Sequence, residues 1–330
     1  MLNTRFRPER MTIAPEFPQS EWLNEREVRH STLHGRPVIV YFWNYASLPS
    51  LIFLREVHRL EQRYAGHNLA FIGVHTPLFS FERERHQVER AAQELRSVHP
   101  TLLDNQHATA RAFHTPVVPV AYLVNHKGLI IGHSVHGIPA FERLLQKTLR
   151  DLDPSVSLPM LDPAELEQSA TGVQELFTGV QRGALGNPEG YSLRAPILYR
   201  LPEQRPTGYF YIQGAWQAGE EQLTYVGQTE GIIHMPYEAA EIFAVFSPHH
   251  ELVERMLNPD AISVEIWQDD RPLTEDQRGD DVAATGHVMI DRPRVYHLIR
   301  NRRQEAHELM LRVRSGGFSV YVFSLWGVSA

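Results

Sequence analysis

Two serines, Ser47 and Ser50, have the residue type and the spacing that could support nucleophilic chemistry. A serine hydroxyl attacks an acyl group only when a histidine accepts its proton and a carboxylate orients that histidine. The sequence contains histidines upstream and downstream of the pair, but no motif supplies the orienting acid. A serine hydrolase or transferase at these positions is therefore a minor alternative for the function of this chain.

The two serines lie between a predicted strand and a predicted helix. The run VIVYFW from Val38 to Trp43 is continuously apolar, β-branched and aromatic, which is typical of a fully buried strand. Apolar residues then recur at helical spacing from Phe53 to Tyr64. In the turn between them, Ser47 has the residue type of a helix cap and Pro49 falls in the first helical turn, where its missing N–H costs little.

Three segments resemble the DipZ-type branch of the TlpA-like thiol-disulfide proteins. Residues 42–50, FWNYASLPS, follow the FWTYSCxxC pattern of that branch. Residues 73–82, GVHTPLFSFE, follow its GVHTPEFxFE segment, and residues 117–124 follow its strand that starts at a proline. The resemblance implies an α/β thioredoxin-like domain in which Ser47 and Ser50 occupy the positions of the two redox cysteines.

The loss of both cysteines removes the chemistry of the family. Disulfide exchange requires one thiolate to attack and another to leave, and a serine hydroxyl does neither at neutral pH. The chain contains no cysteine at all, so no other thiol can replace them. We therefore expect no catalytic residue and no cofactor. The resemblance implies His75 as the base nearest the serines, because its strand ends beside the redox turn in this fold.

The resemblance also implies a peptide groove that survives without thiols. In thioredoxin-like folds a cis proline faces the redox turn, and Pro119 holds that place here. We expect Trp43, Tyr45, Val118, Pro119 and His75 to line the groove. Such a groove binds an extended peptide by main-chain pairing, so the expected partner is a protein or an extended peptide.

The remaining elements of the first half follow from the same pattern. We expect an extended lead-in at residues 1–20 and a thioredoxin-like domain at 21–152. Within that domain, strands are predicted at 69–75, 102–105 and 117–124, an edge strand at 129–136, and helices at 80–98 and 141–152. An acidic linker is expected at 153–170.

The regular spacing of strand-like segments and turns predicts a second domain at residues 171–330. Short strands alternate with turns, which predicts an all-β sandwich. Strands are predicted at 208–214, 223–226, 231–235, 242–246, 262–267, 295–299, 308–314 and 318–326. The segments 175–182, 214–219 and 294–300 resemble the C-terminal domain of DipZ-type proteins, which implies a jelly roll similar to carbohydrate-binding modules. Trp216, Tyr209, Tyr211 and Tyr225 could stack on sugars, and Trp216 is placed at a turn by this pattern.

Composition excludes several other classes. The net charge is −7 and no basic run occurs, which argues against nucleic acid as a partner. No segment has the length of a transmembrane helix, and the N-terminus has no apolar core of a secretory signal, so we expect a soluble, cytoplasmic protein without membrane insertion. The 18 histidines have no metal-ligand spacing: His133 and His136 would point to opposite faces of a strand.

The sequence thus favours a binding or scaffold protein that is not an enzyme. Its thioredoxin-like half retains the peptide groove, and its β-sandwich is appended to that half. One alternative is a glycan-binding protein whose thioredoxin-like half is only structural. The minor alternative is serine chemistry at Ser47 and Ser50.

Overall fold

The computed structural model describes residues 12–18, 21–24, 28, 34–115, 117–134, 138–161, 172–248, 262–314 and 316–328. The chain divides into two compact units, Met1–Ala170 and Thr171–Ala330. Each unit has its own sheet and its own hydrophobic core.

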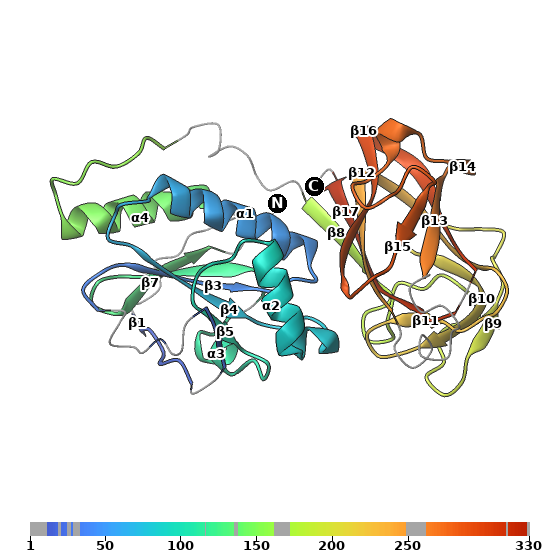
Figure 1. The fold of residues 1–330 in the computed structure, drawn as a ribbon, viewed down its shortest axis with the longest axis horizontal. Helices are drawn as coiled ribbons and strands as arrows, with labels where there is room; N and C mark the ends of the chain where they lie inside the picture. Colours follow the sequence, from blue (N-terminus) through green and yellow to red (C-terminus); the bar gives the residue numbers. More distant parts are fainter. Residues whose placement is uncertain are drawn as a thin grey trace. The chain divides into compact units, whose positions relative to one another are not determined.

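Unit 1 contains a seven-stranded mixed sheet in the order β1-β7-β6-β3-β4-β5-β2 (Figure 1). The strands β3, β4 and β5 are parallel, and β6 and β7 continue the sheet antiparallel on the other side of β3. The strands are β1 (Thr12–Ile13), β2 (Trp22–Leu23), β3 (Val38–Trp43), β4 (Ala70–His75), β5 (Thr101–Leu103), β6 (Val120–Val124) and β7 (Leu129–Ser134). This arrangement is a thioredoxin-like fold.

Helices cover the sheet of unit 1 on both faces. They are α1 (Leu48–Arg63), α2 (Arg85–Glu94), α3 (Ala108–Ala112) and α4 (Ile138–Leu152), with a 3-10 turn η2 (Ser80–Arg83) before α2. Figure 1 shows α1 and α4 side by side over one face of the sheet. On the other face Phe113, which ends α3, packs edge-on against Phe42 of β3. The side chains of β3 are all buried, so this strand is the centre of the unit.

The pattern of the sequence predicted β3 and α1 closely, and it was wrong at two places in unit 1. Residues 80–98 do not form one helix, because Glu84 has an extended main chain (φ −74°, ψ 111°) that separates η2 from α2. The strand predicted at 129–136 is not at the edge of the sheet, because β1 pairs with it through Thr12 and Ile130. The lead-in therefore contributes a strand to the sheet. His136 lies outside the described residues.

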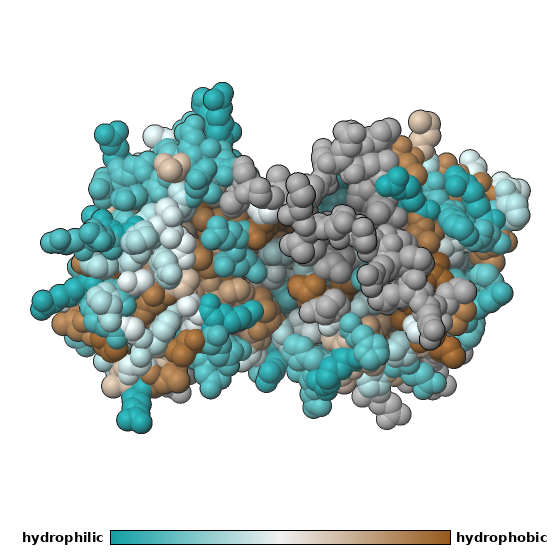
Figure 2. Space-filling view, turned by 180° about the vertical axis from the view of Figure 1, so that it is seen from behind, coloured by the Kyte–Doolittle hydropathy of each residue, from teal (hydrophilic) through white to brown (hydrophobic). Residues whose placement is uncertain are grey.

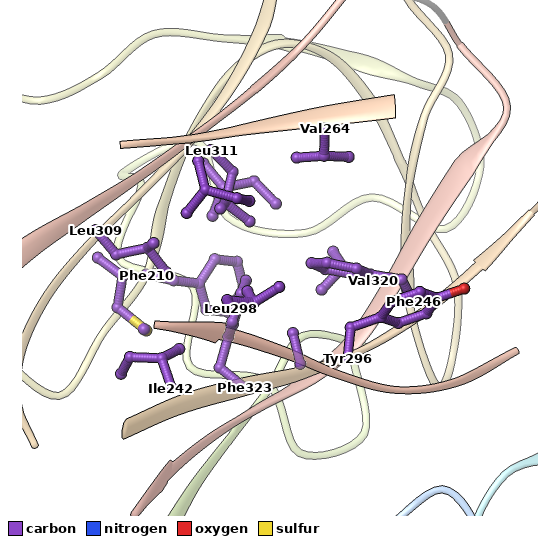
Figure 3. Close-up of a cluster of buried hydrophobic side chains, with 14 of the residues drawn as sticks. Phe210, Ile242, Phe246, Val264, Tyr296, Leu298, Leu309, Leu311, Val320 and Phe323 are labelled. Atoms are coloured by element: carbon purple, nitrogen blue, oxygen red, sulfur yellow. The ribbon is translucent and has the colours of Figure 1, made fainter. Parts of the chain in front are cut away.

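Unit 2 is a large antiparallel β-structure with a single core. Its strands are β8 (Gly172–Phe177), β9 (Ile197–Tyr199), β10 (Tyr211–Ala218), β11 (Leu223–Tyr225), β12 (Gly231–Pro248), β13 (Ser263–Gln268), β14 (Arg271–Pro272), β15 (His287–Met289), β16 (Arg294–Val313) and β17 (Phe318–Val328), with a 3-10 turn η4 (Glu275–Gln277). Side chains from several strands meet in the core drawn in Figure 3, among them Phe246 of β12, Val264 of β13, Leu311 of β16 and Phe323 of β17. Such a core between layers of strands is consistent with a β-sandwich.

Two strands of unit 2 are much longer than the sequence indicated. The segments predicted as separate strands at 231–235 and 242–246 are both parts of β12, and those predicted at 295–299 and 308–314 are both parts of β16. The polar residues between them break the apolar alternation, but main-chain pairing continues, as at Glu238 and Ala306. A register shift between Ala239 and Glu241 divides β12. The first half of β12 pairs with β10 and its second half pairs with β17, so this one strand connects β10 and β17 within the sheet.

Candidate functional site

The hydroxyl groups of Ser47 and Ser50 both build the turn between β3 and α1. The Ser47 Oγ accepts a hydrogen bond from the Ser50 main-chain N–H at 3.5 Å, which caps the first turn of α1. The Ser50 Oγ accepts one from the Asn44 N–H at 3.3 Å. Ser47 is 4% exposed and Ser50 is fully buried. The predicted helix cap is confirmed, and both hydroxyl groups serve the main chain of the turn rather than a base.

The buried carboxylate of Glu82, in η2, is hydrogen-bonded to the main chain of this turn. Its Oε1 accepts hydrogen bonds from the N–H groups of Tyr45 and Ala46, both at 3.0 Å. Its Oε2 accepts from Leu78 at 2.7 Å and from Phe79 at 3.0 Å. Four main-chain donors therefore compensate the burial of one negative charge, which removes the cost that an unpaired buried carboxylate would carry.

His75, at the end of β4, lies against Glu82 and the aromatic residues of the turn. Its Nε2 is 3.7 Å from the Glu82 Oε1, which is too long for a hydrogen bond. The His75 ring stacks on Tyr45 and packs edge-on against Trp43, with centroid distances of 5.7 and 5.2 Å. Imidazole, indole and phenol thus form one buried layer under the turn.

These contacts do not assemble a serine triad. Among the described residues, neither ring nitrogen of His75 has a hydrogen-bond partner, so no serine hydroxyl reaches it. The sequence offered no orienting acid. The structure does bring a carboxylate near His75, but the oxygens of Glu82 are already used by main-chain donors. Sequence reasoning missed this role of Glu82, although the residue closes the GVHTPLFSFE segment that carried the resemblance.

The segment before β6 lies beside the turn. The Val118–Pro119 peptide bond is cis, which confirms that prediction. The antiparallel ladder between β3 and β6 ends at the pair of Phe42 and Val120, so Val118 lies beyond the last paired residue. Val117 is 43% exposed and Val118 is half-buried, whereas Pro119 is buried. Val118 and Pro119 therefore lie at the same end of the sheet as Trp43, Tyr45 and His75, and the last three are buried.

The predicted sugar-stacking platform is not present as an exposed aromatic surface. Trp216 lies inside β10 rather than at a turn, and its indole is fully buried in the core of unit 2 against Tyr225 and Phe318. Tyr211 and Tyr225 are buried as well, and Tyr209 alone among the four is exposed, at 47%. The prediction for Trp216 was wrong because a residue that precedes a turn signal can still belong to the strand before it.

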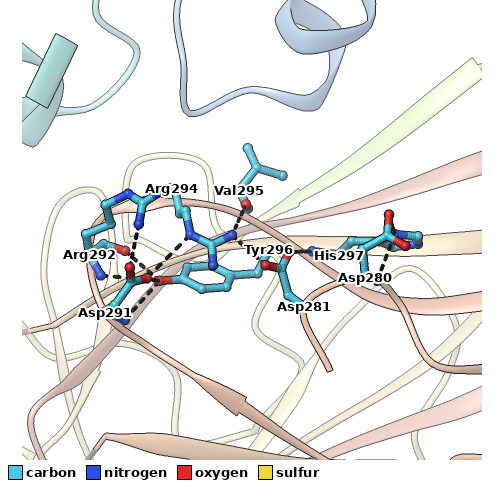
Figure 4. A network of polar contacts seen from close by, with 8 residues as sticks. All are labelled: Asp280, Asp281, Asp291, Arg292, Arg294, Val295, Tyr296 and His297. Carbon is cyan, nitrogen blue, oxygen red and sulfur yellow. Dashed lines mark hydrogen bonds and ion pairs between the residues drawn. The ribbon is translucent and has the colours of Figure 1, made fainter. Parts of the chain in front are cut away.

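A charged cluster of unit 2 is drawn in Figure 4, and its charged groups pair with one another. The Tyr296 hydroxyl lies 2.8 Å from the Asp291 Oδ1, and the Arg294 guanidinium lies 3.7 Å above the Tyr296 ring and pairs with Asp281. Hydrogen bonds from Arg300 and from His297 lower the pKa of Asp280. Every charge has a partner of opposite sign, so this network closes a loop onto β16 and is not a ligand site.

Metal and membrane contacts find no support in the described part of the chain. Within those ranges no three histidine, aspartate or glutamate side chains gather in a way that could hold a metal ion. No helix there combines the length and apolarity that crossing a bilayer requires. The face seen in Figure 2 is largely hydrophilic, with hydrophobic patches between the polar side chains.

The fold and the turn define this chain as a thioredoxin-like protein without redox cysteines, joined to an antiparallel β unit. Residues 173–325 match the family model described as the thioredoxin-like C-terminal domain. Protein DipZ of Mycobacterium bovis and Protein DipZ of Mycobacterium tuberculosis are each 26% identical over 234 residues, which cover 68% of this chain and 33% of each relative. This chain is therefore similar to the two DipZ proteins over about two thirds of its own length. The chain spans about a third of the length of those relatives.

Other similarities are confined to part of the chain. NHL repeat-containing protein 2 of Homo sapiens is 27% identical over 118 residues, which cover 34% of this chain and 16% of that protein. The solution structure of a thioredoxin-like protein in the oxidized form is 23% identical, with a TM-score of 0.39, and covers 43% of this chain and 97% of that one.

Proposed function

We propose that this chain is a binding protein that holds extended peptides at the edge of its thioredoxin-like unit and performs no thiol chemistry. The edge in question consists of residues 44–47 and 117–119 and is called the turn edge below. The observation that carries the proposal is the hydrogen bonding of Ser47 and Ser50, whose hydroxyl groups close the turn internally. The turn is thus maintained as a structure although its redox couple is absent.

The main chain at the turn edge has the properties that strand addition needs. Val118 lies past the end of the β3–β6 ladder, so that ladder does not use its main-chain groups. Val117 is exposed beside it. A peptide that pairs with an exposed main chain gains affinity from hydrogen bonds and specificity from the pockets of alternate side chains. Glu82 makes the opposite side of the edge rigid, because it fixes the N–H groups of Tyr45 and Ala46.

Unit 2 fits this proposal as a scaffold. We assign it to the jelly-roll class that the resemblance implies, with its aromatic residues in the core rather than on a sugar-binding face. Trp216, Tyr211 and Tyr225 are buried, so glycan binding at these residues is not part of the proposed function.

Titration of the full chain with reduced, carboxamidomethylated lactalbumin tests the proposal, because this polypeptide is unfolded and offers no free thiol. We expect saturable binding in calorimetry, and no binding of the native, folded lactalbumin. In a parallel assay of insulin-disulfide reduction, the chain should show no turnover above a Ser47→Ala control. Turnover above that control, or no binding of the unfolded polypeptide, would contradict the proposal.

A further inference from the structure

The chain reverses direction after α4 and returns along that helix (Figure 1). Asp153 begins the reversal, because its carbonyl accepts a hydrogen bond from the Val156 N–H at 3.2 Å. Residues 156–160, VSLPM, follow without helix or strand and are called the strap below. The second and last residues of the strap are exposed, and the other three are half-buried. The strap therefore packs part of its apolar surface against unit 1.

Two side chains hold the end of the strap by its main-chain carbonyl groups. The Gln146 Nε2 of α4 donates a hydrogen bond to the Pro159 carbonyl at 2.7 Å, and Arg150 donates to the Gln146 Oε1 at 3.2 Å. The Arg63 guanidinium, in the last turn of α1, donates to the Met160 carbonyl. Neither a carboxamide nor a guanidinium changes its charge between pH 5 and pH 8, so these contacts hold the strap independently of pH.

A histidine holds the beginning of the strap, and both of its ring nitrogens face main-chain carbonyl oxygens. The His67 Nε2 is 2.9 Å from the Ser157 carbonyl oxygen of the strap. Its Nδ1 is 3.2 Å from the carbonyl oxygen of Tyr64, which caps the end of α1. A carbonyl oxygen only accepts hydrogen bonds, and a neutral imidazole carries one N–H. The neutral ring therefore leaves one nitrogen without a proton against a carbonyl, whereas the imidazolium donates to both.

We infer that His67 is a pH-sensitive latch, which holds the strap against α1 and α4 most tightly when its ring is protonated. Histidine is the side chain whose charge ordinarily changes between pH 5 and pH 8. The second ring proton completes the pair of hydrogen bonds, and a charged donor makes both of them stronger. The strap should therefore loosen as the pH rises from 5 to 8. This inference does not rest on peptide binding at the turn edge.

The ionisable groups next to the latch keep their charge over this pH range. The Arg63 guanidinium pairs with Glu142 of α4 at 3.4 Å, so an opposite charge balances it. The ring of Tyr64 packs edge-on against the latch ring, with a centroid distance of 5.5 Å. Burial raises the pKa of Tyr64, so its phenol stays neutral. Protonation of His67 is therefore the change of charge at the beginning of the strap.

The charged groups at the end of α4 and in the reversal are paired or hydrogen-bonded as well. Lys147 and Asp151 pair with each other at 2.6 Å. The hydroxyl and the N–H of Ser155 both donate to the carboxylate of Asp153, and these hydrogen bonds lower the pKa of Asp153. These groups therefore stay ionised from pH 5 to pH 8 and do not imitate the latch.

Proteolysis measures how tightly the strap is held. The full chain is digested briefly with proteinase K at pH 5, 6, 7 and 8, and mass spectrometry gives the rate of first cuts within the strap. A free peptide with the sequence of residues 153–161 is digested in parallel, and division by its rate removes the pH dependence of the protease. The normalised rate should be at least about fivefold lower at pH 5 than at pH 8, because acid adds a charge-assisted hydrogen bond.

The expected trend is opposite to that of the fold as a whole. Burial lowers the pKa of His99, so opening of the whole fold becomes easier in acid and would speed up cleavage there. Slower cleavage of the strap in acid therefore reports the latch and not global stability.

Three variants connect the pH dependence to His67. His67→Gln carries no group that titrates in this range, so its normalised rates at pH 5 and pH 8 should agree within about twofold. Gln146→Ala removes a contact that does not titrate, so cleavage should be faster at every pH while the ratio between pH 8 and pH 5 stays that of the wild type. His86→Gln, which removes an exposed histidine of α2, is the matched control and should behave as the wild type.

Two results would overturn the inference. The first is a normalised rate in the wild type that stays constant from pH 8 to pH 5 or rises in acid. The second is a folded His67→Gln variant, checked by circular dichroism, that keeps the pH dependence of the wild type. Should that variant fail to fold, His67→Asn takes its place with the same expected result.

Discussion

The Glu82 carboxylate accepts a hydrogen bond at 3.0 Å from the main-chain N–H of Ala46, the residue directly before Ser47. A second bond of the same length joins the same oxygen to the N–H of Tyr45. The conformation of the turn therefore depends on a side chain that lies more than thirty positions further along the chain. Because none of these contacts involves a thiol, the turn retains its shape when both redox positions are serine.

Glu82→Gln tests this dependence. A carboxamide has one acceptor oxygen and places an NH2 group against main-chain N–H donors, so two of the four donors lose their acceptor. We expect the free energy of unfolding to fall by about 2–4 kcal/mol in urea titration. Glu84→Gln is the matched control, because Glu84 is exposed and its side chain does not cap α2. Equal stability of the two variants would show that Glu82 does not hold the turn.

The double variant Ser47→Cys/Ser50→Cys tests the geometry of the former redox positions. Ser47 caps α1 and Ser50 follows within its first turn, a spacing that brings the two β-carbons within reach of a disulfide. After oxidation with glutathione we expect no free thiol by Ellman titration and a mass two hydrogens below that of the reduced form. Each single variant should keep one free thiol. Two free thiols in the oxidised double variant would contradict this alignment of the turn.

One buried histidine, His99, and one half-buried histidine, His58, predict how stability depends on pH. Burial lowers the pKa of His99 and of His58, and the proximity of His99 lowers the pKa of His58 further. His99 lies between Tyr41 of β3, 2.9 Å from its Nδ1, and Glu61 of α1, 2.9 Å from its Nε2. With a folded pKa below the unfolded value of about 6.5, the unfolded chain binds more protons below that pH. Stability is therefore full above about pH 6.5 and falls as the pH decreases further.

His99→Gln should make this pH dependence weaker. The measurement is the free energy of unfolding in urea at several pH values between 5 and 8, for the wild type and the variant. The variant should lose less stability between pH 7 and pH 5 than the wild type, whatever its stability at pH 8. His86→Gln, which removes an exposed histidine of α2, is the control and should match the wild type. An unchanged slope in His99→Gln would exclude this role for His99.

Substitutions of two aromatic residues in unit 2 test which of them contributes to the hydrophobic core and which lies at the surface. Trp216→Ala removes a fully buried indole and should lower the free energy of unfolding by about 3–5 kcal/mol. Tyr209→Ala removes an exposed side chain and should change it by less than about 0.5 kcal/mol. Guanidinium unfolding of the two variants measures both values. A stable Trp216→Ala variant would place the indole outside the core and reopen its role as a sugar platform.

The sequence predicted those parts of the fold in which local pattern and buried position agree. The apolar run of β3 and the cap at Ser47 were both visible in the sequence, because each depends on neighbours along the chain. The short helix α3 was not predicted. Its first turn is capped by Asp104, whose two carboxylate oxygens accept hydrogen bonds from the main-chain N–H groups of Thr109 and Ala110. The spacing of apolar residues along the sequence does not indicate such a cap.

The site was predicted less completely for a similar reason. Trp43, Val118 and Pro119 follow from the resemblance, and the register of β3 and β6 brings them to the same end of the sheet. Glu82 was missed because a charged residue in a charged segment is expected to lie at the surface. Only its hydrogen bonds to four main-chain N–H groups, two of them in the distant turn, show that it is buried and structural. In unit 2, the polar residues inside β12 and β16 made each strand look like two separate strands in the sequence. The two strands are continuous because their main chains stay paired, and main-chain pairing does not depend on the hydropathy of the side chains.

Hydrogen–deuterium exchange of the full chain, with and without saturating carboxamidomethylated lactalbumin, tests the central claim most directly. Peptide binding at the turn edge predicts slower exchange in residues 44–47 and 117–118, with little change in the core strands of unit 2. The Ser47→Ala variant should show the same protection, because the proposed binding uses no chemistry at that hydroxyl. Unchanged exchange at the turn edge in the presence of bound polypeptide, or protection confined to unit 2, would contradict the claim.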